Sequence, residues 1–278
     1  MSSPDFHANI SDIRSVERLV PGQRPQAINV ANVAASIRPF KFVVEGGDDT
    51  PTSMPRTAYQ LVYEDGTVML DSGLNKATHD SFSDAGNEPY DPPAFMRLKQ
   101  ALDQTRLIIF THYHADHVAG VLTAENFTEL ARKTMITRDT ADFLVNNPHR
   151  PHLKLSETQV NEFVHFDYET YLPVAPGVVM IKAPGHSPDS QIIFIRLASG
   201  REILHVVDSA WNMENITREK GKAAPWVKED KEALLAQLKW LNGLRSSEPD
   251  LTFLITHDES QLNTVTEEGI VGRELRIS

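Results

Sequence analysis

The sequence predicts a mixed α/β fold with two β-sheets and helices outside them. Short apolar runs of strand length precede helix-like stretches twice along the chain, and no motif string is repeated. A chain of 278 residues with 40% hydrophobic side chains can bury a large core. We therefore expect one domain over residues 1–278, with residues 1–38 as an N-terminal arm or extension.

The expected elements of the first half lead to a histidine-rich segment. Asp65-Gly66 between two apolar runs indicates a β-hairpin. Apolar residues at Phe95, Leu98 and Leu102 share one face of a helix. Prolines interrupt any regular pattern in residues 1–38. Three interpretations of this stretch stay open: an arm, an entry helix or a surface for a partner. The expected strands are 40–44, 58–63, 67–70 and 107–110, and the expected loops are 46–55 and 75–93.

The second half repeats the order of strands before helices. Ser156 and Gln159 are spaced to open a short helix inside an otherwise broken stretch, residues 138–173. Ser199-Gly200 indicates a second hairpin. Leucines spaced for one stripe predict an amphipathic helix over residues 231–245. The other expected elements are a helix over 118–132 and strands at 134–137, 178–181, 191–197, 202–207 and 251–255.

Composition limits the classes of function and partner. The net charge of −11 argues against binding to a phosphate backbone as the main activity, so we expect no nucleic-acid partner. No apolar run approaches 18 residues and the N-terminus lacks a signal-peptide pattern, which predicts a cytoplasmic protein with no membrane partner. Without cysteine, neither disulfides nor thiolate ligands are available. The oligomeric state stays open, a homodimer among the options.

The segment that carries most chemical information is His112-x-His114-x-Asp116-His117, directly after an apolar run. In an extended backbone alternate residues share a face, so His112 and His114 can point at one metal ion. A turn into the next helix would bring Asp116 and His117 to a second point nearby. Imidazole and carboxylate groups are usual ligands of zinc and similar ions. The alternative, solvated imidazoles with Asp116 as a helix N-cap, accounts for none of the histidines.

Three further potential ligands, His186, Asp208 and His257, each follow an apolar strand. Taken singly they have ordinary explanations as a turn residue, a strand-ending cap and a satisfied histidine. Together with the histidine-rich segment they supply seven ligands, enough for two metal ions. The remaining histidines are predicted to be non-ligands, although His149 and His152 lie in a broken loop that could overhang a pocket; these residues are His7, His79, His149, His152, His165 and His205.

The motifs of this chain, and the order in which they occur, resemble those of the metallo-β-lactamase superfamily over roughly residues 59–258. The matching elements are Asp71-Ser72-Gly73, the histidine-rich segment, Pro184-Gly185-His186, Asp208 and Thr256-His257. The resemblance implies a four-layer αββα sandwich with the site at one edge of the two sheets. It implies a first ion held by His112, His114 and His186, a second held by Asp116, His117 and His257, and Asp208 as a bridge. Asp71 matches the carboxylate that orients a ligand imidazole from outside the metal site.

Within the superfamily, the spacings are most similar to those of the N-acyl-homoserine lactonases, which share the 22-residue step from His186 to Asp208. Those enzymes carry a tyrosine three residues after the bridging aspartate, where this chain has Trp211. An indole can donate a hydrogen bond but cannot act as a phenol does. We predict that Trp211 contacts the substrate as part of the pocket wall.

The predicted activity is that of a metal-dependent hydrolase acting on a small molecule. Two divalent ions close together lower the pKa of a shared water, and the resulting hydroxide can open a lactone or related cyclic ester. Asp208 and Asp116 are the predicted catalytic carboxylates, Asp116 as one possible source of the proton for the leaving alkoxide. Zinc is the expected ion, with manganese, iron or cobalt as alternatives. Hydrolysis of an aryl ester, cyclic amide or phosphotriester, and a non-hydrolytic metal-binding or redox module, stay open as other functions.

Overall fold

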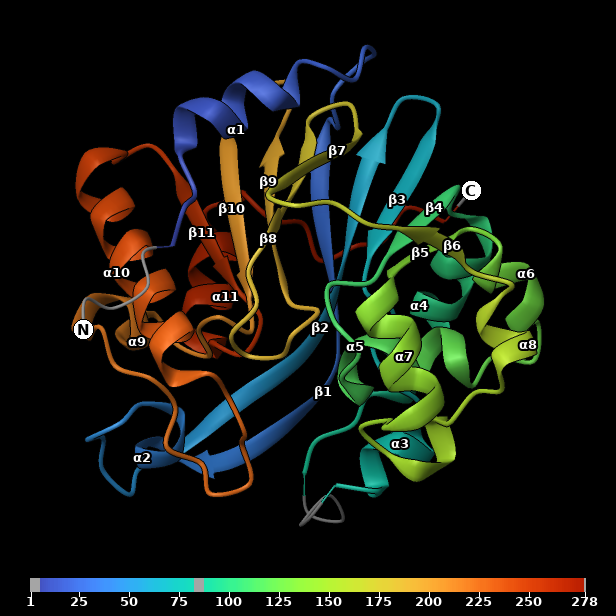
Figure 1. Ribbon diagram of the computed structural model, residues 1–278, viewed down its shortest axis with the longest axis horizontal. Coiled ribbons are helices and arrows are strands. Elements are labelled where there is room, and N and C mark those ends of the chain that lie inside the picture. Colours follow the sequence, from blue (N-terminus) through green and yellow to red (C-terminus); the bar gives the residue numbers. More distant parts are fainter. Residues whose placement is uncertain (1–5, 83–87, 278) are drawn as a thin grey trace. The chain divides into compact units, whose positions relative to one another are not determined.

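The computed structural model describes residues 6–82 and 88–277, and the chain divides into two compact units (Figure 1). The six-stranded unit comprises residues 27–36, 55–167 and 266–278. The five-stranded unit comprises residues 1–26, 37–54 and 168–265. Two long strands, β1 (Ala27–Pro39) and β2 (Pro51–Tyr63), run from one unit into the other. The expectation of a single domain over the whole chain stays a prediction.

The six-stranded unit is built on a mixed sheet in the order β1-β2-β3-β4-β5-β6. Strands β2 and β3 form the antiparallel hairpin predicted around Asp65-Gly66, and β3 to β6 are parallel. The remaining strands are β3 (Gly66–Leu70), β4 (Leu107–Ile109), β5 (Thr134–Thr137) and β6 (Val164–Phe166). Its helices are α3 (Lys76–Asp80), α4 (Pro92–Gln104), α5 (Ala115–Leu122), α6 (Phe127–Ala131), α7 (Arg138–Asn146), the 3₁₀ turn η2 (Pro151–Leu153) and α8 (Glu157–Val160).

Local sequence explains where these helices begin. Asp91 accepts a hydrogen bond from the Ala94 N–H group at the start of α4, and Pro92 occupies the first turn, where a missing N–H group costs nothing. Ser156 and Gln159 form the capping box predicted for α8. The predicted apolar face of α4 is confirmed, because Leu98 and Leu102 are buried in the core of this unit.

The five-stranded unit is built on a sheet in the order β11-β10-β9-β8-β7. Its strands are β7 (Tyr171–Ala175), β8 (Val178–Lys182), β9 (Gln191–Arg196), β10 (Glu202–Val207) and β11 (Thr252–Ile255). Strands β9 and β10 form the hairpin predicted around Ser199-Gly200, and β10 pairs with β11 in parallel. Its helices are α1 (Ile10–Glu17), α2 (Phe40–Val43), α9 (Met213–Arg218), α10 (Lys231–Ser247) and α11 (Glu259–Glu267, ending just beyond the unit).

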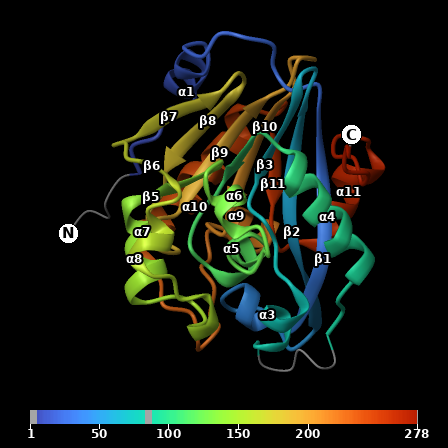
Figure 2. The ribbon, with the colours of Figure 1, turned by 90° about the vertical axis from the view of Figure 1, so that its right-hand side faces the viewer.

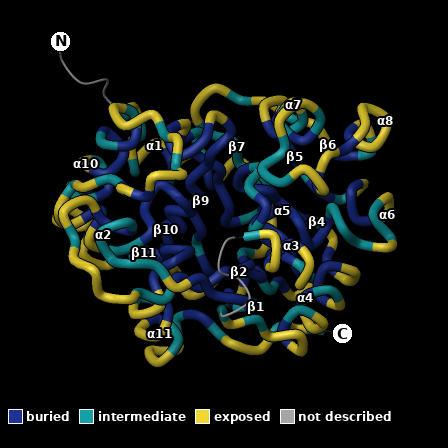
Figure 3. Tube along the Cα trace, turned by 90° about the horizontal axis from the view of Figure 1, so that it is seen from below, coloured by how far each residue is buried: buried dark blue, intermediate teal, exposed yellow. Residues whose placement is uncertain are grey.

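The core of the five-stranded unit lies between its sheet and helix α10. The leucine stripe predicted for this helix, from Leu234 to Leu244, packs with strand residues such as Phe194 and Leu204. Strand β10 is buried throughout, whereas α8 and α11 carry exposed residues (Figure 3). Within the six-stranded unit, helix α4 lies beside strand β1 (Figure 2). Among the described residues, no helix combines the length and the apolarity needed to cross a bilayer.

Several predictions of local structure were wrong. Residues 40–44, predicted as a strand, contain the one-turn helix α2, since a run of four apolar residues and Lys41 after Pro39 fits a helical turn as well as a strand. The expected loop 75–93 contains α3, and the helix expected over 118–132 is two helices, α5 and α6. Strand β2 already begins at Pro51, inside the expected loop 46–55. The described part of the N-terminal stretch contains α1 and most of strand β1, and its assignment as an arm or extension stays a prediction.

Candidate metal centre

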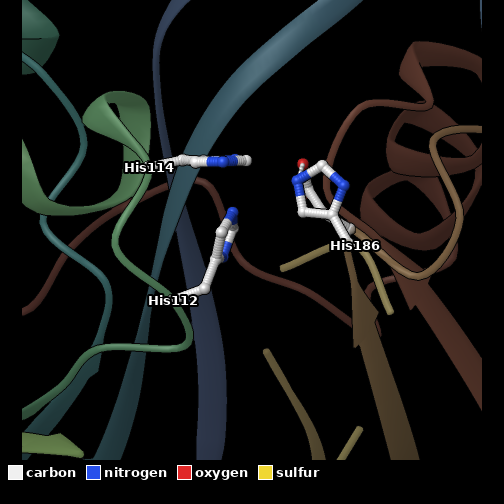
Figure 4. Close-up of side chains that lie close together, drawn as sticks. His112, His114 and His186 are labelled. Atoms are coloured by element: carbon white, nitrogen blue, oxygen red, sulfur yellow. Dashed lines mark ion pairs between the residues drawn. The ribbon is translucent and has the colours of Figure 1, made fainter. Parts of the chain in front are cut away.

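The histidine-rich segment lies in the connection between β4 and α5. Strand β4 ends at Ile109, so His112 and His114 follow the strand rather than share one of its faces. Helix α5 has His114 at its N-cap position, and Asp116 lies in the first turn instead of capping it. A ring nitrogen of His112 lies within 4.8 Å of one of His114, and the ring centroids are 4.6 Å apart (Figure 4). The segment after the strand therefore brings these two imidazoles together, and their role as ligands of one ion stays a prediction.

His117 is held by a carboxylate from the end of the preceding strand. Asp71 Oδ2 lies 2.8 Å from His117 Nδ1, and both side chains are buried. The Thr111 N–H and hydroxyl groups donate to the same carboxylate, each at 2.8 Å. Asp71 adopts φ 62°, a left-handed conformation that aspartate tolerates better than most residues. Because the Nδ1 hydrogen faces Asp71, the lone pair of Nε2 is the one available to a metal ion.

Asp116 lies beside a group of cationic and aromatic side chains in the same unit. Arg56 Nη1 lies 3.8 Å from Asp116 Oδ2, with both side chains largely buried. The ring of Phe82 has the guanidinium of Arg56 at 3.8 Å and that of Arg150 at 4.0 Å from its centroid. Burial lowers the pKa of Arg150, and the attraction of Asp116 opposes this effect. Asp116, the one carboxylate of this segment, therefore has a positive charge close by.

The two histidines of the broken loop lie close to this segment. His149 Nδ1 accepts a hydrogen bond of 3.0 Å from the Ala115 N–H group, and its ring centroid lies 4.3 Å from that of His114. His152 Nε2 lies 2.9 Å from the Thr78 hydroxyl. His149 therefore supports the first turn of α5, and its place as a non-ligand stays a prediction.

In the five-stranded unit, two histidines converge on Asp208 just after β10. Asp208 Oδ2 lies 3.2 Å from His186 Nε2 and 3.3 Å from His257 Nε2. Two donor atoms of a tetrahedral zinc ion, each about 2.0–2.1 Å from the ion, lie roughly 3.3 Å apart. The spacing of these side chains therefore fits ligands that share a divalent ion. Figure 4 shows the ring of His186.

Trp211 supports Asp208 directly. Its indole N–H donates a hydrogen bond of 2.9 Å to Asp208 Oδ2, and the residue is only 8% exposed. The side chain packs with Val43, Val44 and Met54. The sequence predicted a wall of the substrate pocket here; that role stays a prediction, whereas the hydrogen bond to Asp208 was not foreseen.

Sequence reasoning missed a buried ion pair beside His186. Glu229 Oε1 lies 2.6 Å from His186 Nδ1, and Lys222 pairs with the same carboxylate oxygen. Burial raises the pKa of Glu229, but the positive charge of Lys222 and the hydrogen bond with His186 more than offset this effect and lower it. No motif marks these residues, which follow His186 by 36 and 43 positions. Only the path of the connection between α9 and α10 places them there.

The predicted non-ligand histidines of the sheets make backbone contacts. His205 Nδ1 lies 3.1 Å from the Leu254 carbonyl oxygen, and His165 Nε2 lies 2.9 Å from that of Val160. His205 is buried within β10, as its position three residues before Asp208 suggested.

The amino-acid sequence is similar to those of known proteins. Residues 52–199 match the family model of the metallo-beta-lactamase superfamily. An N-acyl homoserine lactonase from Bacillus thuringiensis is 25% identical over 223 residues, which cover 75% of this chain and 83% of that protein.

Solved structures are similar in fold. A structure of N-acyl homoserine lactone hydrolase with the product N-hexanoyl-L-homoserine bound at the catalytic metal center has a TM-score of 0.65 at 19% identity, covering 87% of this chain and 97% of that one. AidC, described as a dizinc quorum-quenching lactonase, has a TM-score of 0.60 at 13% identity, covering 84% and 87%.

The two sheets with their helices, and the similarity to these structures, confirm the predicted α/β fold class. Because the family model matches more than half of the sequence, the chain belongs to the metallo-beta-lactamase superfamily. This match confirms the resemblance to the superfamily that the motifs indicated. Its relatives by sequence are N-acyl homoserine lactonases.

Proposed function

We propose that this protein is a dinuclear metal-dependent hydrolase that opens the ring of a lactone. The observation that carries the metal centre is the approach of His186 and of His257 to Asp208, because each histidine nitrogen lies from Asp208 Oδ2 at the spacing of two ligands of one ion. The substrate class rests on the relatives, which are N-acyl homoserine lactonases. Zinc is the ion that we propose, because nitrogen and oxygen ligands without thiolate suit it.

Seven side chains are proposed as ligands, with the roles that the motifs predict. His112, His114 and His186 would hold one ion, Asp116, His117 and His257 the other, and Asp208 would bridge them. When bound, the ions supply an activated water and polarise the carbonyl group that it attacks. A donor set of neutral imidazoles and carboxylates fits ions of this kind.

Neighbouring residues hold the side chains of these proposed ligands in a defined orientation. Asp71 fixes the ring of His117 with the Nδ1 hydrogen directed away from the metal position. The indole N–H of Trp211 donates to the carboxylate of Asp208 and orients it. Asp116, beside Arg56, is the carboxylate that we propose to accept the proton of the attacking water and to pass it to the leaving alkoxide.

A substrate panel with metal analysis tests this function. Protein loaded with zinc should contain two ions per chain and should open N-acyl homoserine lactones and simple γ- and δ-lactones faster than it cleaves aryl esters, cyclic amides or phosphotriesters. Protein with two ions that opens no lactone but cleaves one of the other substrates would refute the lactonase assignment. Active, fully loaded protein with at most one ion would refute the dinuclear centre.

A further inference from the structure

A buried pair of opposite charges lies behind His186, on the side of the ring away from Asp208. Lys222 Nζ donates to Glu229 Oε1 and, at 2.5 Å, to the backbone carbonyl oxygen of Asp208. Glu229 Oε1 also lies 2.6 Å from His186 Nδ1. The Lys222 side chain is 0% exposed and that of Glu229 is 4% exposed. One lysine and one glutamate therefore contact two of the proposed metal ligands.

Stability alone is a weak reason for such a pair. Removing two charges from water costs several kcal/mol per ion, and replacing a buried ion pair with apolar residues of similar volume is often neutral or stabilising by about 1–4 kcal/mol. Lys222 also lies 5.2 Å from the ring centroid of Trp211, which in turn donates to Asp208. The pair thus contacts His186 itself, and both the backbone of Asp208 and the tryptophan that donates to its carboxylate. A pair that served only to fill the core would not need these contacts.

The contact with His186 repeats the contact of Asp71 with His117. In each case a buried carboxylate oxygen lies opposite Nδ1, at 2.6 Å and 2.8 Å respectively. Lys222 Nζ also lies 3.3 Å from His186 Nδ1, but the carboxylate is closer and Lys222 donates to Glu229 and to the Asp208 carbonyl oxygen. A carboxylate accepts hydrogen bonds, so the ring places its hydrogen on Nδ1 and keeps the lone pair on Nε2. His186 Nε2 is the atom that lies 3.2 Å from Asp208 Oδ2.

We infer that Glu229 and Lys222 are positioning residues of the metal centre: Glu229 fixes the tautomer and direction of His186, and Lys222 ties Glu229 to the backbone of Asp208. This inference rests on the proposed function, because it takes His186 as a metal ligand. Residues that hold a ligand in this way typically affect metal affinity by about 10–100-fold. Lys222 has a second effect, since its positive charge would repel a bound cation if Glu229 did not neutralise it.

The test compares Glu229→Met with the double variant Lys222→Met/Glu229→Met. Glu229→Met leaves a buried lysine without its carboxylate, so both the thermal stability of the metal-free protein and its zinc affinity should fall. The double variant removes both charges and should recover most of the stability, yet its zinc affinity should stay at least about 10-fold below wild type, because His186 still lacks its acceptor. The control is Lys228→Met/Glu232→Met, a change of the same type at two exposed positions close by.

Zinc affinity is measured by competition with a chromophoric chelator, and stability by thermal unfolding without metal. If the double variant recovers zinc affinity together with stability, the pair is only structural and the inference is wrong. The nitrogen NMR signals of His186 in the metal-free protein provide a readout that does not depend on metal. They should report the Nδ1–H tautomer in wild type and a mixture or the Nε2–H tautomer in Glu229→Met. An unchanged tautomer would also overturn the inference, whereas wild-type protein that binds no zinc would count against the proposed function.

Discussion

Replacing Asp71 with asparagine removes one negative charge from behind His117 with little change in shape. The carboxylate accepts three hydrogen bonds of 2.8 Å, two from Thr111 and one from His117 Nδ1. Asparagine tolerates the left-handed backbone at φ 62°, which alanine does not, so the variant tests the carboxylate rather than the turn. Its amide offers one acceptor oxygen and places an NH₂ group where the second carboxylate oxygen was.

That NH₂ group conflicts with the present tautomer of His117. To avoid two donors facing each other, the imidazole must move its hydrogen to Nε2, which then cannot bind a metal ion. A hydrogen bond to a charged group contributes about 1.5–3 kcal/mol, so the metal-free Asp71→Asn variant should lose stability of that order. Its zinc affinity should fall about 10–100-fold, the usual effect of losing such a carboxylate.

Zinc competition and urea unfolding measure the two effects separately. Asp65→Asn is the matched control, because the Asp65 side chain is 73% exposed in the hairpin turn. It should leave zinc affinity unchanged. Asp71→Asn that binds two zinc ions with wild-type affinity would refute the reasoning that the carboxylate prepares His117 for a metal.

Four further outcomes follow from the same geometry. Asp208→Asn should leave the fold intact but reduce kcat for lactone opening by orders of magnitude, and near-normal kcat would remove the residue from the site. Trp211→Phe keeps an aromatic ring at this position but loses the N–H group that donates to Asp208. Steady-state assays should therefore show a kcat about 10-fold lower, which is about 1.4 kcal/mol, with KM nearly unchanged. A change in KM alone would favour a role as a wall of the substrate pocket. Gly120→Ala would place a Cβ atom 2.0 Å from the Ser72 carbonyl oxygen, so urea unfolding should show a loss of about 3 kcal/mol, and wild-type stability would contradict this packing. Removal of metal by a chelator should abolish activity and lower the melting temperature, both restored by zinc, whereas activity that survives would contradict a catalytic metal.

The sequence was most informative where chemistry and periodicity coincide. The strands with clear apolar runs and turn signals were predicted, as were the leucine stripe of α10 and the capping box of Ser156 and Gln159. The potential ligands were identifiable because several histidines and carboxylates follow buried strands, which is rare without a function. The short run 40–44 was not predictable, because five residues, four of them apolar, are too few to show a period that separates a strand from one turn of helix.

The residues that hydrogen-bond to the proposed ligands were harder to predict than the proposed ligands themselves. Asp71 was found only because it belongs to a recognised motif. Glu229 and Lys222 have no such motif, and their positions depend on how the connection between α9 and α10 folds back on His186. For Trp211, the position three residues after Asp208 was evident, but not whether the indole faces solvent or the carboxylate. Contacts of this kind depend on tertiary packing, which local sequence does not encode.

The two carboxylate–imidazole pairs explain how residues outside the strands can hold the proposed ligands in a defined direction. His117 lies in the first turns of α5 and His186 in the connection after β8, and neither position alone fixes the rotation of an imidazole ring. Asp71 lies 46 residues before His117, and Glu229 lies 43 residues after His186. Because each carboxylate comes from a distant segment, a ring keeps its direction only while the fold around it is complete. Metal affinity in this protein should therefore report on the folding of these connections as well as on the ligands themselves, so a variant such as Gly120→Ala should weaken zinc binding without touching a ligand.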